Sequence, residues 1–236
     1  MANGDTSPKG GGAPQGARAG APLICGVDEA GRGPLRGPLV VAGISVEKPE
    51  WLADIGVKDS KKLTPKRREE LAGKIRQFCK IEVVPIPAAR IYALRKEMTM
   101  NELEVRTFAA VIERLRPTEA YLDAADTREK YFGDEVGKLV PFPLKIVSEH
   151  KADATYPIVS GASIIAKTVR DAEMRRIGEE LNDTVGSGYP SDPITMAFVR
   201  RWLNRTGSSP PYTRNSWETM SNLKDEKSIK KLDSFP

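Results

Sequence analysis

Two apolar runs near the start of the chain are separated only by a short turn. The first, LICGVDEA, covers residues 23–30, and the second, GPLVVAGISV, covers residues 37–46. Each has the length and the β-branched content of a buried strand. The Gly31 to Pro34 turn is too short for the helical crossover that joins parallel strands. The two strands are therefore expected to form a hairpin, and the sheet that contains them is expected to be mixed rather than purely parallel.

The rest of the chain alternates between helical and strand patterns. This alternation is typical of an α/β fold in which helices flank a central mixed sheet, with a small C-terminal helical extension. The patterns predict, in order, a helix starting at Pro65 with Thr64 as its N-cap, a strand over 81–87, a helix over 100–115, a strand over 120–123, a helix over 127–138, a strand over 143–149, and helices over 158–182 and 192–205.

Composition divides the chain into four parts. Residues 1–21 are rich in Gly, Ala and Pro, so we expect them to be disordered. Residues 22–185 carry the strand and helix patterns of the main folded domain. Residues 186–222 are expected to form a helical, substrate-binding extension, and residues 223–236 a charged, flexible tail.

Composition also narrows the class of protein. The chain has 236 residues, of which 39% are hydrophobic, and this suits a domain with one sizeable core. Two cysteines, Cys25 and Cys79, give no disulfide framework and no zinc-ligand pattern. No apolar run is long enough to span a membrane, and no signal peptide is recognisable, so we expect a cytoplasmic protein. The formal net charge of +5 favours a polyanionic partner.

Three of the predicted strands end in or near carboxylates. Asp28 and Glu29 lie at the end of the first strand, Asp123 ends the strand over 120–123, and Asp153 follows the strand over 143–149. Sites in α/β sheets gather at the carboxyl ends of strands, and like charges gathered there need compensation. A hard divalent cation such as Mg²⁺ supplies it. The alternative, that each acid is only a turn or cap residue, stays open.

The adjacent pair raises a problem of geometry. Neighbouring residues of a regular strand point to opposite faces, so Asp28 and Glu29 share one site only if the strand has already ended. The glycines that follow them permit such a turn. The pattern therefore predicts that the strand stops at these acids.

Other catalytic sets are absent from the sequence. The single histidine, His150, leaves little room for a Ser-His-Asp triad. No P-loop pattern occurs, and the spacing of the early glycines differs from the dinucleotide-binding fingerprint.

Polar and basic residues lie close to these acids in sequence. Ser163, Lys167 and Arg170 are spaced so that they share one face of the helix over 158–182. The alternative for this helix face is that it is merely solvated, and the alternative for Tyr189 is that it serves packing alone. The residues expected to contact substrate in addition to that face are Arg32 in the glycine turn, Lys61 before a helix, and Tyr189 in the GSGYPSDP loop.

Five motifs together resemble one known family. They are GVDEAGRGPLRGPLVVAG, DSKKLT, YLDAADT, HKADATYPIVSGASIIAKTVRD and GSGYPSDP, and they span about residues 23 to 195. In this order they resemble ribonuclease HII, the type 2 ribonuclease H, and most closely its archaeal members. The resemblance implies a ribonuclease H-like fold and an endonuclease that hydrolyses the RNA strand of RNA–DNA hybrids. It also implies cutting 5′ to ribonucleotides embedded in duplex DNA, for ribonucleotide and RNA primer removal.

The resemblance also implies roles for particular residues. The four acids match carboxylates that hold two Mg²⁺ or Mn²⁺ ions for phosphodiester hydrolysis, which leaves 5′-phosphate and 3′-hydroxyl ends. The remaining matches are Gly31, Arg32 and Gly33 at the turn that contacts the ribose 2′-hydroxyl, Tyr189 at the RNA–DNA junction, and Lys61, Ser163 and Lys167 near phosphates.

Some features depart from the family pattern. Arg36 stands at a position that is usually apolar, and we expect it to face solvent or to contact a phosphate. In the C-terminal tail, Leu232 and Phe235 have the spacing of a peptide that binds a sliding clamp, although Ile229 and Pro236 depart from that pattern.

A monomer is expected. A non-catalytic hybrid-binding module and a phosphatase for small phosphoesters remain as alternatives.

Overall fold

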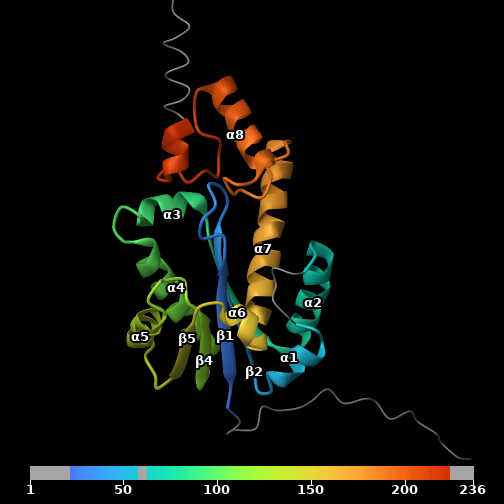
Figure 1. The fold of residues 1–236 in the computed structure, drawn as a ribbon, viewed down its shortest axis with the longest axis vertical. Helices are drawn as coiled ribbons and strands as arrows, with labels where there is room; N and C mark the ends of the chain where they lie inside the picture. The colour runs from blue at the N-terminus through green and yellow to red at the C-terminus, as the bar shows by residue number, and fades with distance from the viewer. Residues whose placement is uncertain (1–21, 58–62, 224–236) are drawn as a thin grey trace, which may run out of the picture.

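The computed structural model describes residues 22–57 and 63–223 (Figure 1). Five strands form one sheet in the order β3-β2-β1-β4-β5. The elements are β1 (Ile24–Ala30), β2 (Leu39–Val46), α1 (Glu50–Asp54), α2 (Pro65–Phe78), β3 (Lys80–Ile86), α3 (Ala88–Leu94), α4 (Met100–Leu115), β4 (Glu119–Asp123), α5 (Glu129–Leu139), β5 (Lys145–Glu149), α6 (Ala152–Thr155), α7 (Pro157–Leu181) and α8 (Pro193–Thr206).

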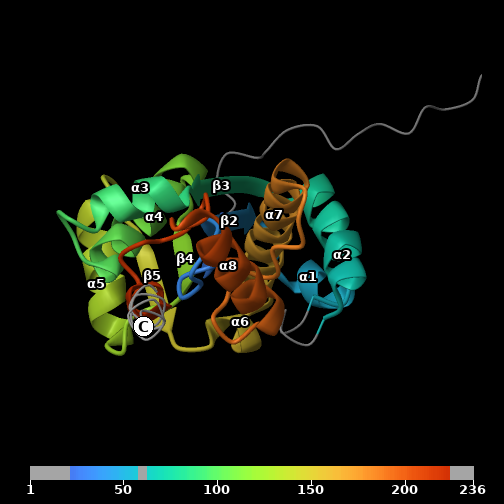
Figure 2. The ribbon, with the colours of Figure 1, turned by 90° about the horizontal axis from the view of Figure 1, so that it is seen from above.

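The sheet is mixed, as the hairpin predicted. Strand β2 pairs antiparallel with β1 and with β3, whereas β4 pairs parallel with β1 and with β5. Helices cover both faces, as the view from above shows (Figure 2). One apolar core lies between the sheet and α1, α2 and α7, and a second lies between the sheet and α4 and α5. The predicted α/β fold with a helix-flanked sheet is therefore confirmed.

Helix α7 lies directly on the backbone of β1. A Cβ atom added to Gly26 would come within 2.4 Å of the Ile158 backbone, so only glycine permits this approach. The contact places the first turn of α7 against the strand that carries Asp28. The close packing explains how two segments about 130 residues apart in sequence build one site.

The longer predicted helices are present with bounds close to those expected. Thr64 caps α2 by accepting a hydrogen bond from the Arg67 amide at 3.3 Å, as its position before Pro65 predicted. Sequence reasoning missed α1, α3 and α6, which have five, seven and four residues. Helices this short carry too few residues for a periodic apolar pattern.

The residues after α7 form a further small core. Leu35 of the β1–β2 turn packs there with α8, the end of α7 and the segment that reaches residue 223. Figure 1 shows α8 at the end of the molecule where that turn lies. None of the described helices is long and apolar enough to cross a membrane. The N-terminal 21 residues, Lys61 and residues 224–236 of the C-terminal tail lie outside the described residues.

Candidate active site

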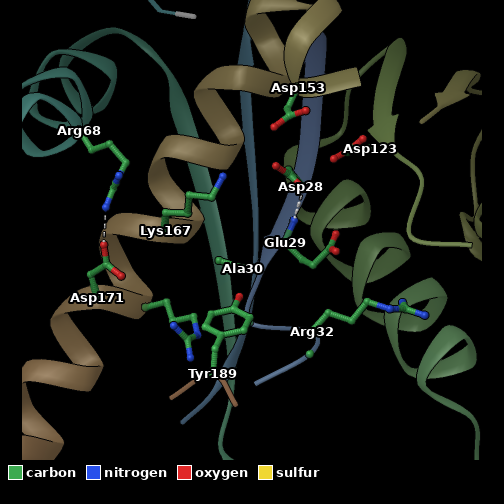
Figure 3. Close-up of a pocket in the computed structure, with 13 residues that line it drawn as sticks. Asp28, Glu29, Ala30, Arg32, Arg68, Asp123, Asp153, Lys167, Asp171 and Tyr189 are labelled. Atoms are coloured by element: carbon green, nitrogen blue, oxygen red, sulfur yellow. Dashed lines mark hydrogen bonds and ion pairs between the residues drawn. The ribbon is translucent and has the colours of Figure 1, made fainter. Parts of the chain in front are cut away.

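Three carboxylates meet at the ends of the central strands. Asp28 of β1, Asp123 of β4 and Asp153 of α6 each place one oxygen within 4.8 Å of the other two (Figure 3). The parallel register pairs Val27 with Leu122, so Asp28 and Asp123 are the next residues on neighbouring strands. Sequence reasoning predicted these three acids, and the structure brings them together.

Asp153 reaches the cluster through a short helix rather than from a strand end. Lys151 has a positive φ of 57°, which turns the chain from β5 into α6. The Ala152 amide donates to Asp123 Oδ1 at 3.0 Å, and the Ser160 hydroxyl donates to the Asp153 carbonyl oxygen. The first contact holds α6 against β4, and the second holds it against the start of α7.

The expectation that the strand stops at Asp28 and Glu29 is wrong. Strand β1 runs on to Ala30, with Glu29 opposite Val41 on β2. Glu29 therefore leaves β1 on the other face, and its carboxylate points away from the three aspartates toward the side of Arg32 (Figure 3). It still lines the same cavity.

Burial and mutual repulsion govern the charges of these acids. Burial raises the pKa of Asp28 well above its usual value, and the nearby charges of Glu29 and Asp123 raise it further. A hydrogen bond from Ser163 and the charge of Lys167 act in the opposite direction. Burial also raises the pKa of Glu29 to about 7, again helped by Asp123. The charges and hydrogen bonds around Asp28 and Glu29 therefore offset burial and repulsion only in part.

The chemistry of the cluster fits a divalent metal. Glu29 Oε2 is buried and has no hydrogen-bond partner among the described residues. Carboxylate oxygens gathered within 4.8 Å are the ligands that hard cations prefer, and a cation would lower the raised pKa values. The residues present therefore suit the metal that the acidic pattern predicted.

A cavity of about 360 Å³ opens in front of the acids. Most of the predicted substrate-contacting residues that the structure describes line it. Ser163 instead is fully buried, where it accepts a hydrogen bond from Lys167 Nζ at 3.0 Å and is hydrogen-bonded to Asp28. The predicted residues at the cavity, besides the acids, are Gly31, Arg32, Gly33, Lys167, Arg170 and Tyr189.

Two of the predicted cations are held by the protein itself. The Arg32 guanidinium forms an ion pair with the fully buried Glu104 of α4 and donates to Asn101 Oδ1 at 2.5 Å. Arg170 donates to the Ser187 carbonyl oxygen at 2.9 Å, and its guanidinium carbon lies 5.0 Å from the centre of the Tyr189 ring. Arg170 thus supports the loop that presents Tyr189.

Arg36 does not face solvent or reach the cavity, so both expectations for it are wrong. Its side chain is completely buried in the C-terminal core. It lies 4.2 Å from the centre of the Phe198 ring and donates to the Pro211 carbonyl oxygen at 3.1 Å. Burial lowers its pKa to about 10. Arg36 therefore packs the extension against the turn.

Sequence reasoning missed several charged partners of the site. The helical pattern over 100–115 does not single out Glu104, which pairs with Arg32. Arg68 and Asp171 pair at 2.9 Å on the cavity wall, although they are 103 residues apart in sequence. Local spacing holds no signal for such contacts.

A mixed sheet that carries buried carboxylates beside a partly cationic cavity is the arrangement of a metal-dependent nuclease with the ribonuclease H-like fold. Solved structures agree. The ribonuclease H2 of Pyrococcus horikoshii matches 86% of this chain and 98% of its own, with a TM-score of 0.80 and 39% identity. The chain of a PCNA:RNase HII complex from Archaeoglobus fulgidus matches 85% and 96%, with a TM-score of 0.79 and 42% identity.

The sequence comparisons are more specific than the fold. Residues 25–220 match the family model described as Ribonuclease HII. The ribonuclease HII of Methanoregula boonei is 44% identical over 213 residues, covering 90% of this chain and all of that protein. That of Methanocella arvoryzae is 47% identical over 199 residues, covering 83% and 89%.

The chain belongs to the ribonuclease HII family. Enzymes of this family are metal-dependent endonucleases that cleave the RNA strand of RNA–DNA hybrids and ribonucleotides embedded in DNA.

Proposed function

We propose that Asp28, Glu29, Asp123 and Asp153 bind two Mg²⁺ or Mn²⁺ ions and that the cavity in front of them holds the scissile phosphodiester. The three aspartate oxygens within 4.8 Å of one another are the observation that carries this proposal. Such ions, when bound, lower the pKa of an attacking water and stabilise the leaving 3′ oxygen. Asp28, on the central strand β1, would be the ligand shared by the two ions.

The cavity wall supplies the contacts to substrate. Lys167 attracts the phosphate next to the acids, and Ser163 keeps Asp28 in place. Tyr189, which is 37% exposed, packs against the sugar or base at the RNA–DNA junction. The Gly31–Gly33 turn reads the 2′-hydroxyl, which distinguishes RNA from DNA.

Cleavage of a DNA duplex that contains one ribonucleotide tests this function. We expect a single cut 5′ to the ribonucleotide, with 5′-phosphate and 3′-hydroxyl ends, in Mg²⁺ or Mn²⁺ and none in EDTA. An all-DNA duplex of the same sequence is the control and stays intact. Cleavage in EDTA contradicts the metal mechanism, and binding without cleavage in both metals supports the non-catalytic module. Turnover of a small phosphomonoester supports the phosphatase.

We also propose that the C-terminal tail binds a sliding clamp through Leu232 and Phe235. The spacing of these residues and the PCNA:RNase HII complex of the Archaeoglobus fulgidus relative support the proposal. We expect Phe235→Ala to remove most of the clamp signal in a pull-down with the archaeal clamp protein. Equal capture of a chain that lacks its last eight residues would remove the idea.

We further propose roles for the two folded parts of the chain and a monomeric state. Residues 22–185 act as the catalytic domain, and residues 186–222 act as an extension that binds substrate in a monomeric cytoplasmic protein. The position of Tyr189 on the cavity supports a substrate role for the extension. Size-exclusion chromatography with light scattering tests the monomer.

A further inference from the structure

One fully buried arginine of the extension binds the backbone of the β1–β2 turn. Arg214 is 0% exposed, and all of its guanidinium nitrogens donate to carbonyl oxygens of that turn. The acceptors are Gly31 at 2.6 Å from Nη2, Arg32 at 2.8 Å from Nη1, and Gly37 at 3.0 Å from Nη2 and 3.2 Å from Nε.

Trp217 adds a contact to the same turn. Its indole Nε1 donates to the Gly33 carbonyl oxygen at 3.3 Å. Three successive carbonyls, those of residues 31–33, therefore point toward the segment around residue 214, although about 180 residues separate the two segments in sequence. The catalytic domain and the extension meet at this turn.

The geometry of the peptide bond shows what these contacts do. In a trans peptide the N–H points to the side opposite the C=O of the same unit, and the described chain has no cis peptide bond. Because the carbonyls of Gly31 and Arg32 point to Arg214, the amides of Arg32 and Gly33 point away from it. Neither amide donates to another backbone group in the described residues, and both residues line the cavity.

These two amides form a pair of adjacent donors. Gly33 is exposed, and a Cβ placed on it would meet no atom within 4 Å, so the surface beside it is open. Adjacent N–H groups that face an open cavity suit an oxygen acceptor such as a ribose hydroxyl. Gly31 has a φ of +90°, a conformation that few other residues adopt, and the contacts to Arg214 hold it there.

We propose that Arg214, assisted by Trp217, is the positioning residue for ribose recognition: it holds the Gly31–Gly33 turn so that the amides of Arg32 and Gly33 face the 2′-hydroxyl. This inference rests on the proposed role of the turn in reading that hydroxyl. Arg214 does not touch substrate and acts through the backbone. Arginine suits the task because its planar fork reaches several carbonyls at once, which a lysine ammonium does not.

The test measures discrimination between RNA and DNA rather than rate alone. Fluorescence anisotropy in EDTA gives the affinity for a duplex with one ribonucleotide and for the all-DNA duplex of the same sequence. We expect Arg214→Gln to reduce the ratio of these affinities about tenfold, which corresponds to about 1.4 kcal/mol. Trp217→Phe, which removes only the Nε1 donor, is expected to reduce the ratio about threefold.

Arg36→Gln is the matched control. Arg36 is equally buried in the same core but donates to Pro211 instead of residues 31–33, so this variant is expected to lower the melting temperature and keep the wild-type ratio. A wild-type ratio in folded Arg214→Gln overturns the proposal. If Arg214→Gln does not fold, Trp217→Phe decides, and an unchanged ratio there overturns it.

Failure of the underlying function has a different signature. If the wild-type protein itself binds both duplexes equally and cuts neither, the proposed reading of the 2′-hydroxyl is wrong and the positioning role falls with it. If the wild type discriminates and the Arg214 and Trp217 variants do so equally well, only the positioning role is wrong.

Discussion

Two groups of buried charge lie on either side of the β1–β2 turn, and the protein treats them differently. Arg214 is surrounded by backbone carbonyl oxygens, and although burial lowers its pKa to about 9, it stays charged at neutral pH. Asp28 is surrounded by other carboxylates, and burial and their charges raise its pKa well above its usual value. The arginine is satisfied by these carbonyl oxygens, whereas Ser163 and Lys167 offset the burial and repulsion of Asp28 only in part.

This difference separates buried charges that stabilise the fold from buried charges that favour binding of a metal ion. A buried charge that meets well-placed dipoles holds segments together, as Arg214 holds the turn. A buried charge that lies beside like charges is destabilised, and a bound cation relieves that repulsion. Substitution of one member of each kind tests whether stability and activity respond separately.

The largest effect is expected at Asp28. Asp28→Asn keeps the shape of the side chain but removes a metal ligand, so we expect cleavage of a ribonucleotide-containing duplex to fall more than about a thousandfold, or about 4 kcal/mol. Because the substitution also removes a repelling charge, the melting temperature in EDTA should equal or exceed that of the wild type. Single-turnover cleavage and thermal denaturation measure the two effects.

Asp171→Asn is the control for that experiment. Asp171 is a carboxylate on the same cavity wall, but it is paired with Arg68 at 2.9 Å rather than with other acids. Its loss should reduce cleavage less than about tenfold, since the pair is partly exposed and of modest strength. Wild-type turnover by Asp28→Asn, or an equal loss in both variants, would contradict the assignment of the acids.

The alternation of strands and helices, and hence the mixed sheet, could be predicted from the sequence because it rests on local apolar spacing. Asp28 and Asp123 could be predicted because strand ends are visible in that spacing. Glu29 was placed wrongly, since local glycines suggested a turn, whereas pairing with β2 extends the strand to Ala30. Arg36 and the contacts of Arg214 depend on segments about 180 residues apart, which no local pattern encodes.

A second prediction concerns a buried carboxylate that the protein does compensate. Glu104 is 0% exposed and pairs with Arg32. Glu104→Gln leaves the Arg32 guanidinium without its ion-pair partner, so we expect the free energy of unfolding to fall by about 3 kcal/mol. Urea denaturation at pH 7 measures this, and the same chain should still bind Mg²⁺ or Mn²⁺ at the acids.

Glu113→Gln serves as its control, because Glu113 is an exposed acid on the same helix. Its effect on stability should stay within about 0.5 kcal/mol. If Glu104→Gln were as stable as this control, or more stable than the wild type, the ion pair of Glu104 with Arg32 would not stabilise the fold.

The smallest effect is expected at the loop that presents Tyr189. Asp192 caps α8 and accepts hydrogen bonds from the Ser187 amide at 2.6 Å and the Ile194 amide at 2.9 Å. These bonds, led by that from Ser187, lower the pKa of Asp192 to about 2. A lowered pKa in the folded state means that ionised Asp192 stabilises the fold above its usual pKa of 3.8, and that this contribution is lost as the pH falls toward about 2.

Asp192→Asn should therefore cost about 1 kcal/mol at pH 7, an amount already reduced for the solvent exposure of the loop. The difference in unfolding free energy between wild type and variant should shrink as the pH falls from about 4 toward about 2. Asp134→Asn, at an exposed acid of α5, should show no such trend. If the difference in unfolding free energy between wild type and Asp192→Asn stays constant over this range, the charge of Asp192 does not stabilise the loop. A contribution that does not depend on this charge would be the same at every pH.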